Sequence, residues 1–298
     1  VPTPLERERI EHEAFALART KVYIGREEYF KRINEHVKGN DLPLVLLGDS
    51  GSGKSALISK WVEGYREKHP EEFMVMHFIG STPDSADYVR LLRRIMEEIK
   101  ERYPEEKDEI PTDPKKVVEA FSLWLAKASA RGRFILILDA LNQLEDRDNA
   151  PDLGWLPEYF PPNIRVILST LSGRSLEALR KRNYQTLPVQ PIEINERKEF
   201  IERYLEQYRK KLSKPHTGHI ASASQSANPL YLRTLLEELR VFGIYEELEN
   251  RINHYLKAKT VDDLFELVLE RLEKDYDRDR PGLVRDAMSL LWASRRGL

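Results

Sequence analysis

The sequence contains no cysteine among its 298 residues. Disulfide bonds, thiolate metal sites and cysteine nucleophiles are therefore excluded. It also lacks an apolar run of the roughly 18 residues that a membrane-spanning helix needs, and its first residues lack an apolar signal core. These absences predict a soluble, cytoplasmic protein without a membrane partner.

The chain also lacks an excess of either charge. Lys and Arg number 48 and Asp and Glu number 50, so the formal net charge is −2. A near-neutral chain offers no global attraction for nucleic acid. The basic pairs Lys210-Lys211 and Arg295-Arg296 are too short to form a nucleic-acid footprint. Nucleic acid is therefore not expected as a partner.

Short apolar runs alternate with helical patterns in the first two thirds of the chain. Strands are predicted at residues 44–47, 73–79, 134–138 and 164–168. Apolar residues recur at helical spacing between them, for example over residues 85–103 and from Asp113-Pro114 onward. This alternation predicts an α/β fold with a parallel sheet and helices on both faces, in which ligands bind at the carboxyl ends of the strands.

The strand signal stops near Pro191, and helices are expected beyond it. The predicted helices span residues 196–212, 229–242, 245–258, 261–276 and 281–296. Residues between the first two, including His216 and His219, are interpreted as a polar, Ser-rich linker. We therefore expect a helical lead-in at 1–20, an α/β domain at 21–192, a helical domain at 193–258, and the start of a third unit at 259–298.

A glycine-rich segment follows the first predicted strand. Residues 48–55, Gly-Asp-Ser-Gly-Ser-Gly-Lys-Ser, match the P-loop pattern G-x-x-x-x-G-K-[ST]. Glycines let the backbone N–H groups turn toward phosphate oxygens, and the next helix adds its positive N-terminus. Lys54 is expected on the β- and γ-phosphates and Ser55 on Mg²⁺. The predicted nucleotide contacts are Asp49, Ser50, Gly51, Ser52, Gly53, Lys54, Ser55 and Ala56.

Three polar residues follow the later strands. Asp139 ends the apolar run 134–138, where a carboxylate that binds Mg²⁺ through water is expected; a helix N-cap is the alternative. Thr170 ends the next strand, either as a sensor of the γ-phosphate or as a plain strand terminus. Arg174 is the nearest cation for the γ-phosphate in cis, unless it is a surface charge at a helix start.

The residues after Asp139 bear on the rate of hydrolysis. Ala140 occupies the position at which many fast P-loop ATPases carry a glutamate that activates water. Asn142 can orient a water molecule but cannot take its proton. Glu145 and Asp146 could substitute only if the loop folds back. Slow hydrolysis is therefore predicted.

Together these segments resemble the signal-transducing P-loop ATPases called STAND proteins, and more narrowly the NACHT type of the nephrocystin and telomerase-associated-protein branch. The resemblance is carried by residues 24–26 (Ile-Gly-Arg), 48–55, 137–144 (Ile-Leu-Asp-Ala-Leu-Asn-Gln-Leu) and 228–243. The wider class has Gly-x-Pro at the start of the last segment. Here Ala227 and Asn228 precede Pro229, so only the proline carries over.

The resemblance implies ATP or ADP with Mg²⁺ as cofactors; adenine is favoured by the resemblance alone. It implies nucleotide contacts from Ile24, Arg26 and Pro229. The alternatives are a solvated charge for Arg26 and a helix opening for Pro229. It also implies a lid domain at 193–258, the start of a winged-helix domain at 259–298, and a repeat domain or effector outside this chain.

Three functions are compatible with these sequence features. The favoured one is an ATP-binding signal-transduction switch, in which the lid closes on the nucleotide, the chain self-associates when ATP-bound, and slow hydrolysis resets it. The second is an AAA-like or archaeal-type working ATPase, possibly linked to nucleic acid. The third is a small-molecule kinase that would use Arg174, Arg180 and Arg182.

Overall fold

Five parallel strands form one sheet in the computed structural model, which describes residues 2–82, 84–278 and 280–294. The strand order is β2-β3-β4-β1-β5. The strands are β1 Leu44–Leu47, β2 Phe73–Phe78, β3 Phe134–Asp139, β4 Ile164–Thr170 and β5 Gln185–Pro188. Leu47 lies opposite Thr170, and Leu138 lies opposite Leu168. The carboxyl ends of β1, β3 and β4 therefore meet at one edge.

The central strands are buried on both faces, as their largely apolar sequences predict. Every residue of β3 and β4 is buried. By contrast, β5 lies at the edge of the sheet, and only Leu187 of its four residues is buried. Its polar sequence had not been predicted as a strand, because an edge strand needs no continuous apolar run.

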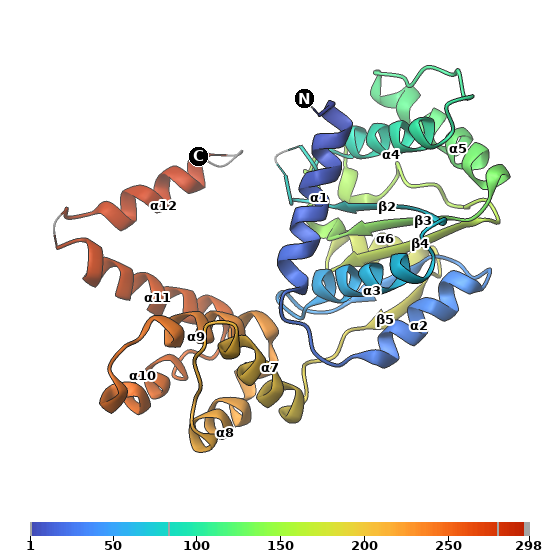
Figure 1. Ribbon diagram of the computed structural model, residues 1–298. Helices are drawn as coiled ribbons and strands as arrows, with labels where there is room; N and C mark the ends of the chain where they lie inside the picture. The colour runs from blue at the N-terminus through green and yellow to red at the C-terminus, as the bar shows by residue number, and fades with distance from the viewer. Residues whose placement is uncertain (1, 83, 279, 295–298) are drawn as a thin grey trace. The chain divides into compact units, whose positions relative to one another are not determined.

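The sheet is accompanied by helices from the same part of the chain (Figure 1). They are α1 Pro4–Thr20, α2 Glu27–Lys38, α3 Lys54–Lys68, α4 Tyr88–Arg102, α5 Pro114–Arg131 and α6 Arg174–Lys181. Asp87 and Asp113 cap α4 and α5 by accepting hydrogen bonds from backbone N–H groups of the first turn. The core includes Ile95 of α4, Phe121 and Trp124 of α5, and strand residues such as Leu136. The predicted α/β class with a parallel sheet is confirmed.

The chain divides into two compact units. One comprises Val1–Lys21, Arg26–Ser50 and Lys54–Val189, and the other comprises Val22–Gly25, Gly51–Gly53 and Gln190–Leu298. The helices of the second unit are α7 Ile194–Glu206, α8 Lys214–Ser222, α9 Pro229–Val241, α10 Leu248–Tyr255, α11 Val261–Tyr276 and α12 Leu283–Ala293. Tyr231 is fully buried in the core of this unit, and its hydroxyl donates to the carbonyls of Tyr255 and Ala258 at 2.9 Å.

The interpretation of the segment before α9 as a polar linker was wrong. Helix α8 forms there because Ser213 caps it and a proline lies in its first turn. It buries Ile220 and Ala221 in the core of the helical unit. His216 lies on this helix, 2.9 Å from a carboxylate oxygen of Glu249.

Three other helix predictions differ from the structure at their bounds. The helix predicted at 196–212 is α7, which ends at Glu206. Residues 245–258 form a 3-10 turn, Tyr245–Glu247, followed by α10, rather than one helix. The predicted end of the last helix at residue 296 lies outside the described residues. Within the described part of the chain, no helix combines the length and apolar character that crossing a membrane requires.

Candidate nucleotide site

The loop between β1 and α3 has the backbone that its glycines predict. Gly51 and Gly53 have φ angles of +75° and +90°, in the left-handed region that residues with a Cβ rarely adopt. Helix α3 begins at Lys54. Ser52 is buried, whereas Ser50 is exposed, and Ala56 is half-buried in the first turn of α3. This loop and helix start have the form that cradles phosphate.

The Lys54 side chain folds back onto the loop that precedes it. Its Nζ donates hydrogen bonds to the carbonyl oxygens of Gly48, at 2.8 Å, and Asp49, at 3.1 Å. Burial lowers the pKa of Lys54, and the negative charges of Asp139 and Asp49 oppose that shift. Since charge-assisted hydrogen bonds to an anion are stronger than those to neutral carbonyls, a phosphate at the loop would compete for this ammonium group.

Asp139 is the carboxylate at the centre of the site. The Ser55 hydroxyl donates to its Oδ2 at 2.5 Å, and the Ser169 hydroxyl donates to its Oδ1. Asp139 is only 1% exposed to solvent. Burial raises the pKa of Asp139, while the two hydroxyl hydrogen bonds and the charge of Lys54 act in the opposite direction. The sheet register brings Asp139 and Ser169 together, since the residues before them, Leu138 and Leu168, are paired.

Ser169 is a site residue that the sequence analysis missed. Besides donating to Asp139, its Oγ accepts a hydrogen bond from the Ala140 N–H at 2.9 Å. The hydroxyl of the neighbouring Thr170 donates to the carbonyl of Leu171 at 3.1 Å. Its role as a γ-phosphate sensor, rather than as a plain strand terminus, stays a prediction. The sequence does show two hydroxyl residues, Ser169 and Thr170, at the end of β4, and this pair indicated a polar site there. Which of the two contacts Asp139 depends on the strand register.

Asn142, expected to orient a water molecule, and Arg174, expected near the γ-phosphate, are both engaged with protein groups. Asn142 Oδ1 accepts a hydrogen bond from the Leu171 N–H at 3.3 Å. Arg174 binds both carboxylate oxygens of Asp152, at 3.0 and 2.9 Å, and Asp146 at 2.6 Å. These hydrogen bonds raise the pKa of Arg174 and lower that of Asp152. The structure thus joins Ser55 with Asp139 but holds Arg174 in a separate ion pair.

The donor set of the site fits Mg²⁺ bound together with a nucleotide. Mg²⁺ prefers oxygen ligands and is usually held by one or two protein oxygens plus phosphate and water. Ser55 and Asp139 supply one hydroxyl and one carboxylate 2.5 Å apart. Within the described residues, no three His, Asp or Glu side chains gather into a metal site of their own. The phosphate-assisted kind of Mg²⁺ site is therefore the one that these side chains fit.

The segments that the resemblance linked to the nucleotide fall in both units. In the helical unit, Ile24 is buried and Pro229 opens α9, where the side chain of Asn228 caps the helix. The Leu230 N–H donates to the carbonyl of Gly51 at 3.3 Å within the same unit. A Cβ on Gly51 would lie 2.6 Å from atoms of Asn228 and Leu230, so only glycine allows this approach.

Arg26 belongs to the α/β unit. It is 9% exposed and adopts a φ angle of +66°, immediately before α2. Its guanidinium carbon lies 5.8 Å from the centroid of the Tyr29 ring. Its role as a nucleotide contact stays a prediction, as do those of Ile24 and Pro229.

Comparison with known proteins places these features in a family context. A sequence model of the NACHT domain matches residues 42–208. The chain is 34% identical to a TPR repeat-containing protein of Dictyostelium discoideum, over 98% of this chain and 22% of the relative. It is 27% identical to nephrocystin-3 of Homo sapiens, over 92% of this chain and 21% of the relative. The chain thus spans about a fifth of the length of these curated relatives.

Solved structures of similar fold include two archaeal proteins. A Walker-type ATPase of Pyrococcus abyssi superposes with a TM-score of 0.55 at 17% identity, over 92% of this chain and 85% of that protein. The Orc1 protein of Aeropyrum pernix, solved in complex with DNA, gives a TM-score of 0.50 at 17% identity, over 78% and 66% of the two chains. At this identity the likeness concerns the fold alone.

Proposed function

The chain belongs to the NACHT family of P-loop NTPases, as predicted from its sequence, and from this premise we propose that it is an ATP-binding switch that hydrolyses ATP slowly. The observation that carries the proposal is the convergence of Lys54, Ser55 and Asp139 at the carboxyl edge of the sheet. Ser55 and Asp139 are hydrogen-bonded at 2.5 Å, and Lys54 starts the same helix as Ser55. This is the arrangement expected to hold a triphosphate with Mg²⁺.

Each residue has a distinct task in the proposed mechanism. The loop N–H groups and the N-terminus of α3 bind phosphate oxygens, and Lys54 turns from the carbonyls of Gly48 and Asp49 toward the β- and γ-phosphates. Ser55 and Asp139 would hold Mg²⁺, Asp139 through water. Mg²⁺ held there supplies positive charge that offsets the charge of the phosphates. Ser169 fixes the orientation of the Asp139 carboxylate.

Slow turnover follows from the residues around Asp139. Ala140, the next residue, cannot accept a proton from water. Asn142 and Arg174 are bound to Leu171 and to the Asp146–Asp152 pair, so neither is directed at a phosphate in this arrangement. Without a general base or a transition-state cation, hydrolysis loses contributions of 10²-fold or more from each.

The switch itself would lie in the helical unit. We assign the lid to helices α7–α10, because α9 opens at Pro229 and its Leu230 N–H contacts Gly51 of the phosphate loop. Exchange of ATP for ADP would change the contacts at this loop and so the free energy of lid closure. Self-association in the ATP-bound state, and a repeat domain outside this chain, are further parts of the proposal; a matched relative is named as a TPR repeat protein.

The test is nucleotide binding and turnover by the purified chain. Bound nucleotide would be released by denaturation and identified by ion-exchange chromatography. Affinity for ATP and GTP and steady-state hydrolysis would then be measured beside Lys54→Ala, with Lys115→Ala on the exposed surface of α5 as the matched control. We expect adenine nucleotide, turnover below the ordinary enzyme range of about 1–10³ per second, and loss of binding in Lys54→Ala alone.

Other outcomes would contradict specific parts of the proposal. Fast turnover that Lys54→Ala abolishes would identify a working ATPase. Preference for GTP would overturn the assignment of adenine. Equal affinity of Lys54→Ala and the unaltered chain would overturn the phosphate site itself.

A further inference from the structure

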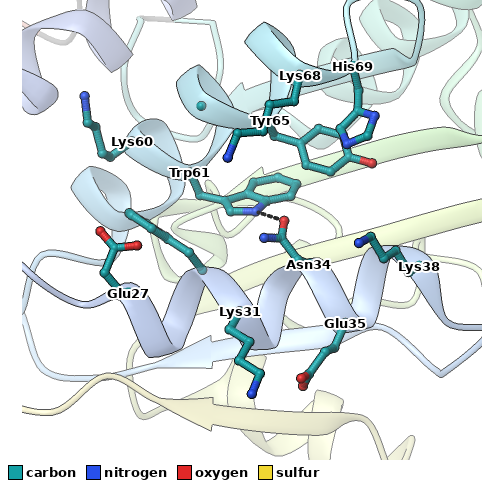
Figure 2. Close-up of a pocket in the computed structure, with 12 residues that line it drawn as sticks. Glu27, Lys31, Asn34, Glu35, Lys38, Lys60, Trp61, Tyr65, Lys68 and His69 are labelled. Carbon is teal, nitrogen blue, oxygen red and sulfur yellow. Dashed lines mark hydrogen bonds between the residues drawn. The ribbon is translucent and has the colours of Figure 1, made fainter.

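A pocket of about 710 Å³ lies between α2 and the second half of α3, apart from the phosphate loop (Figure 2). Its size is within the range of small-molecule sites, about 300–1,000 Å³. Helix α2 contributes Phe30, Asn34 and Lys38, and helix α3 contributes Trp61, Gly64 and Lys68, among others. It shares no residue with the site at Lys54 and Asp139.

The α3 wall of this pocket is a fixed row of rings. Trp61, Tyr65 and His69 follow one another at helical spacing, with ring centroids 4.8 and 4.5 Å apart. Trp61 Nε1 donates to Asn34 Oδ1 at 2.9 Å, the hydrogen bond drawn in Figure 2. The Tyr65 hydroxyl donates to Glu72 at 2.8 Å. Because the polar atoms of Trp61 and Tyr65 are bonded, these two rings are held in place. They are 4% and 5% exposed, so the pocket meets only a small part of each ring.

Gly64 keeps this wall open. It lies inside α3, where glycine destabilises a helix relative to alanine. A Cβ built on Gly64 would meet no atom within 4 Å, and its backbone has no positive φ angle. Neither close packing nor backbone conformation therefore requires glycine here. The absence of a side chain does leave room beside the rings, which a binding site would need.

The charges around the pocket favour an anion. It is lined by four lysines, Lys31, Lys38, Lys60 and Lys68, against two glutamates, Glu27 and Glu35. Lys60 is paired with Glu63 at 3.0 Å. Lys38 and Lys68 form no ion pair or hydrogen bond through their ammonium groups within the described residues. Each also ends its helix, where a cation is favourable, but that role does not explain the open, ring-lined space between them.

We propose that this pocket binds a small organic anion, with a planar apolar body against Trp61 and Tyr65 and an acidic group on Lys38 and Lys68. The amide NH₂ of Asn34 is a further donor at the pocket, because its oxygen is used by Trp61. The acidic group can be a carboxylate, sulfonate or phosphate, since lysine binds each as a point charge. The inference stands apart from the proposed nucleotide function, because it uses none of that site's residues.

The test uses the fluorescent anion 8-anilino-1-naphthalenesulfonate as the probe, on the whole chain without nucleotide. The sequence has four tryptophans. In an ¹⁵N-labelled sample, the indole signal of Trp61 would be assigned by its loss in Trp61→Phe. We expect this signal to shift saturably, with a micromolar dissociation constant. A probe that moves only the signal of Trp292, which is 91% exposed, or that moves none, would overturn the proposal.

Two sets of variants separate shape from charge. Gly64→Leu should fill the space and reduce affinity at least tenfold, whereas Gly64→Ala is the matched control and should bind nearly as well. Lys38→Ala combined with Lys68→Ala should weaken the probe at least fivefold, beside Lys115→Ala with Lys116→Ala on α5. The uncharged analogue N-phenyl-1-naphthylamine should bind more weakly than the sulfonate. Equal binding of the two probes, or no effect of the paired lysine changes, would refute the anion site even if Gly64→Leu fails to fold.

Discussion

The Ser55 hydroxyl donates a hydrogen bond of 2.5 Å to Asp139 Oδ2, and so joins two residues that lie 84 positions apart. The other oxygen of the same carboxylate accepts from Ser169. Both donors lower the cost of keeping Asp139 ionised in a buried position, where burial alone raises its pKa. The two serines therefore act on one carboxylate from different elements: Ser55 from helix α3 and Ser169 from strand β4.

Ser169→Ala should weaken both the fold and the site. It leaves Asp139 Oδ1 without its donor and the Ala140 N–H without its acceptor. Loss of a buried hydrogen bond to a charged group costs about 1.5–3 kcal/mol. We expect a loss of that order in the free energy of unfolding, measured by urea denaturation, and weaker Mg²⁺-dependent ATP binding. Thr170→Val is the comparison, because the Thr170 hydroxyl only bonds the next carbonyl. A larger loss of binding in Thr170→Val would instead support Thr170 as the phosphate sensor.

The ion pairs of Arg174 lead to a prediction about the rate of ATP hydrolysis. Because Asp146 and Asp152 hold its guanidinium, Arg174→Ala should change steady-state ATP hydrolysis little. Replacing both carboxylates, Asp146→Asn with Asp152→Asn, should free the arginine and raise turnover. The paired change made in an Arg174→Ala background is the control and should have no such effect. If Arg174→Ala alone lowers turnover as strongly as Lys54→Ala, the arginine acts in catalysis despite these pairs.

The fold could be predicted where burial leaves a local pattern. Strands β1, β3 and β4 each contain an apolar run whose two faces are covered, and these runs alone indicated the strands, although β3 ends at Asp139 and β4 also contains Arg165, Ser169 and Thr170. Strand β5 could not be found this way, since Gln185 and Thr186 are exposed at the sheet edge. Helix α8 was missed because its serines and histidines indicated a linker. The cap at Ser213 and the proline of the first turn were local signals for this helix, whereas the packing of Ile220 and Ala221 in the core of the helical unit leaves no local pattern.

The site residues could likewise be predicted only where a local sequence pattern indicated them. The spacing of Lys54 and Ser55 after the glycines is local, so the motif alone indicated both. Asp139 was indicated by the end of its apolar strand. Ser169 could not be chosen over Thr170, because the choice depends on the β3–β4 register, in which Leu138 faces Leu168. The pairing of Arg174 with Asp152 depends on a loop whose path has no sequence pattern.

Because two histidines are buried, we expect the free energy of unfolding to fall at mildly acidic pH. Burial lowers the pKa of His77 to about 3, with the charge of Arg94 acting in the same direction, and burial also lowers the pKa of His12. His12 is neutral at Nδ1, which accepts from the Phe78 N–H at 3.2 Å. Since the unfolded chain binds these protons near pH 6.5, stability is complete above that pH and is lost as pH falls toward 3.

The expected loss is about 1.4 kcal/mol per pH unit for each such histidine. Urea denaturation at pH 7.5, 6.5 and 5.5 would measure it. His77→Gln should reduce the change in unfolding free energy per pH unit by the contribution of one histidine. A free energy of unfolding that stays constant over this pH range would contradict the neutral, buried state of both rings.

The ion pair between Arg94 and Glu98 gives the last prediction. Their side chains are only 3% and 7% exposed, and Arg94 Nη2 lies 3.3 Å from Glu98 Oε1. Glu98 also binds Arg9 of α1 at 2.6 Å. Glu98→Gln leaves the buried Arg94 charge with only the more distant carboxylate of Glu8, at 3.7 Å, which should cost about 3 kcal/mol of the free energy of unfolding. Glu101→Gln removes an exposed partner of the same Arg9 and should cost less than about 1 kcal/mol. Chemical denaturation measures both changes. Similarly small losses in the two variants would mean that water reaches Arg94. Because Arg9 of α1 is linked to α4 through Glu98, backbone hydrogen exchange in α1 would then also be fast.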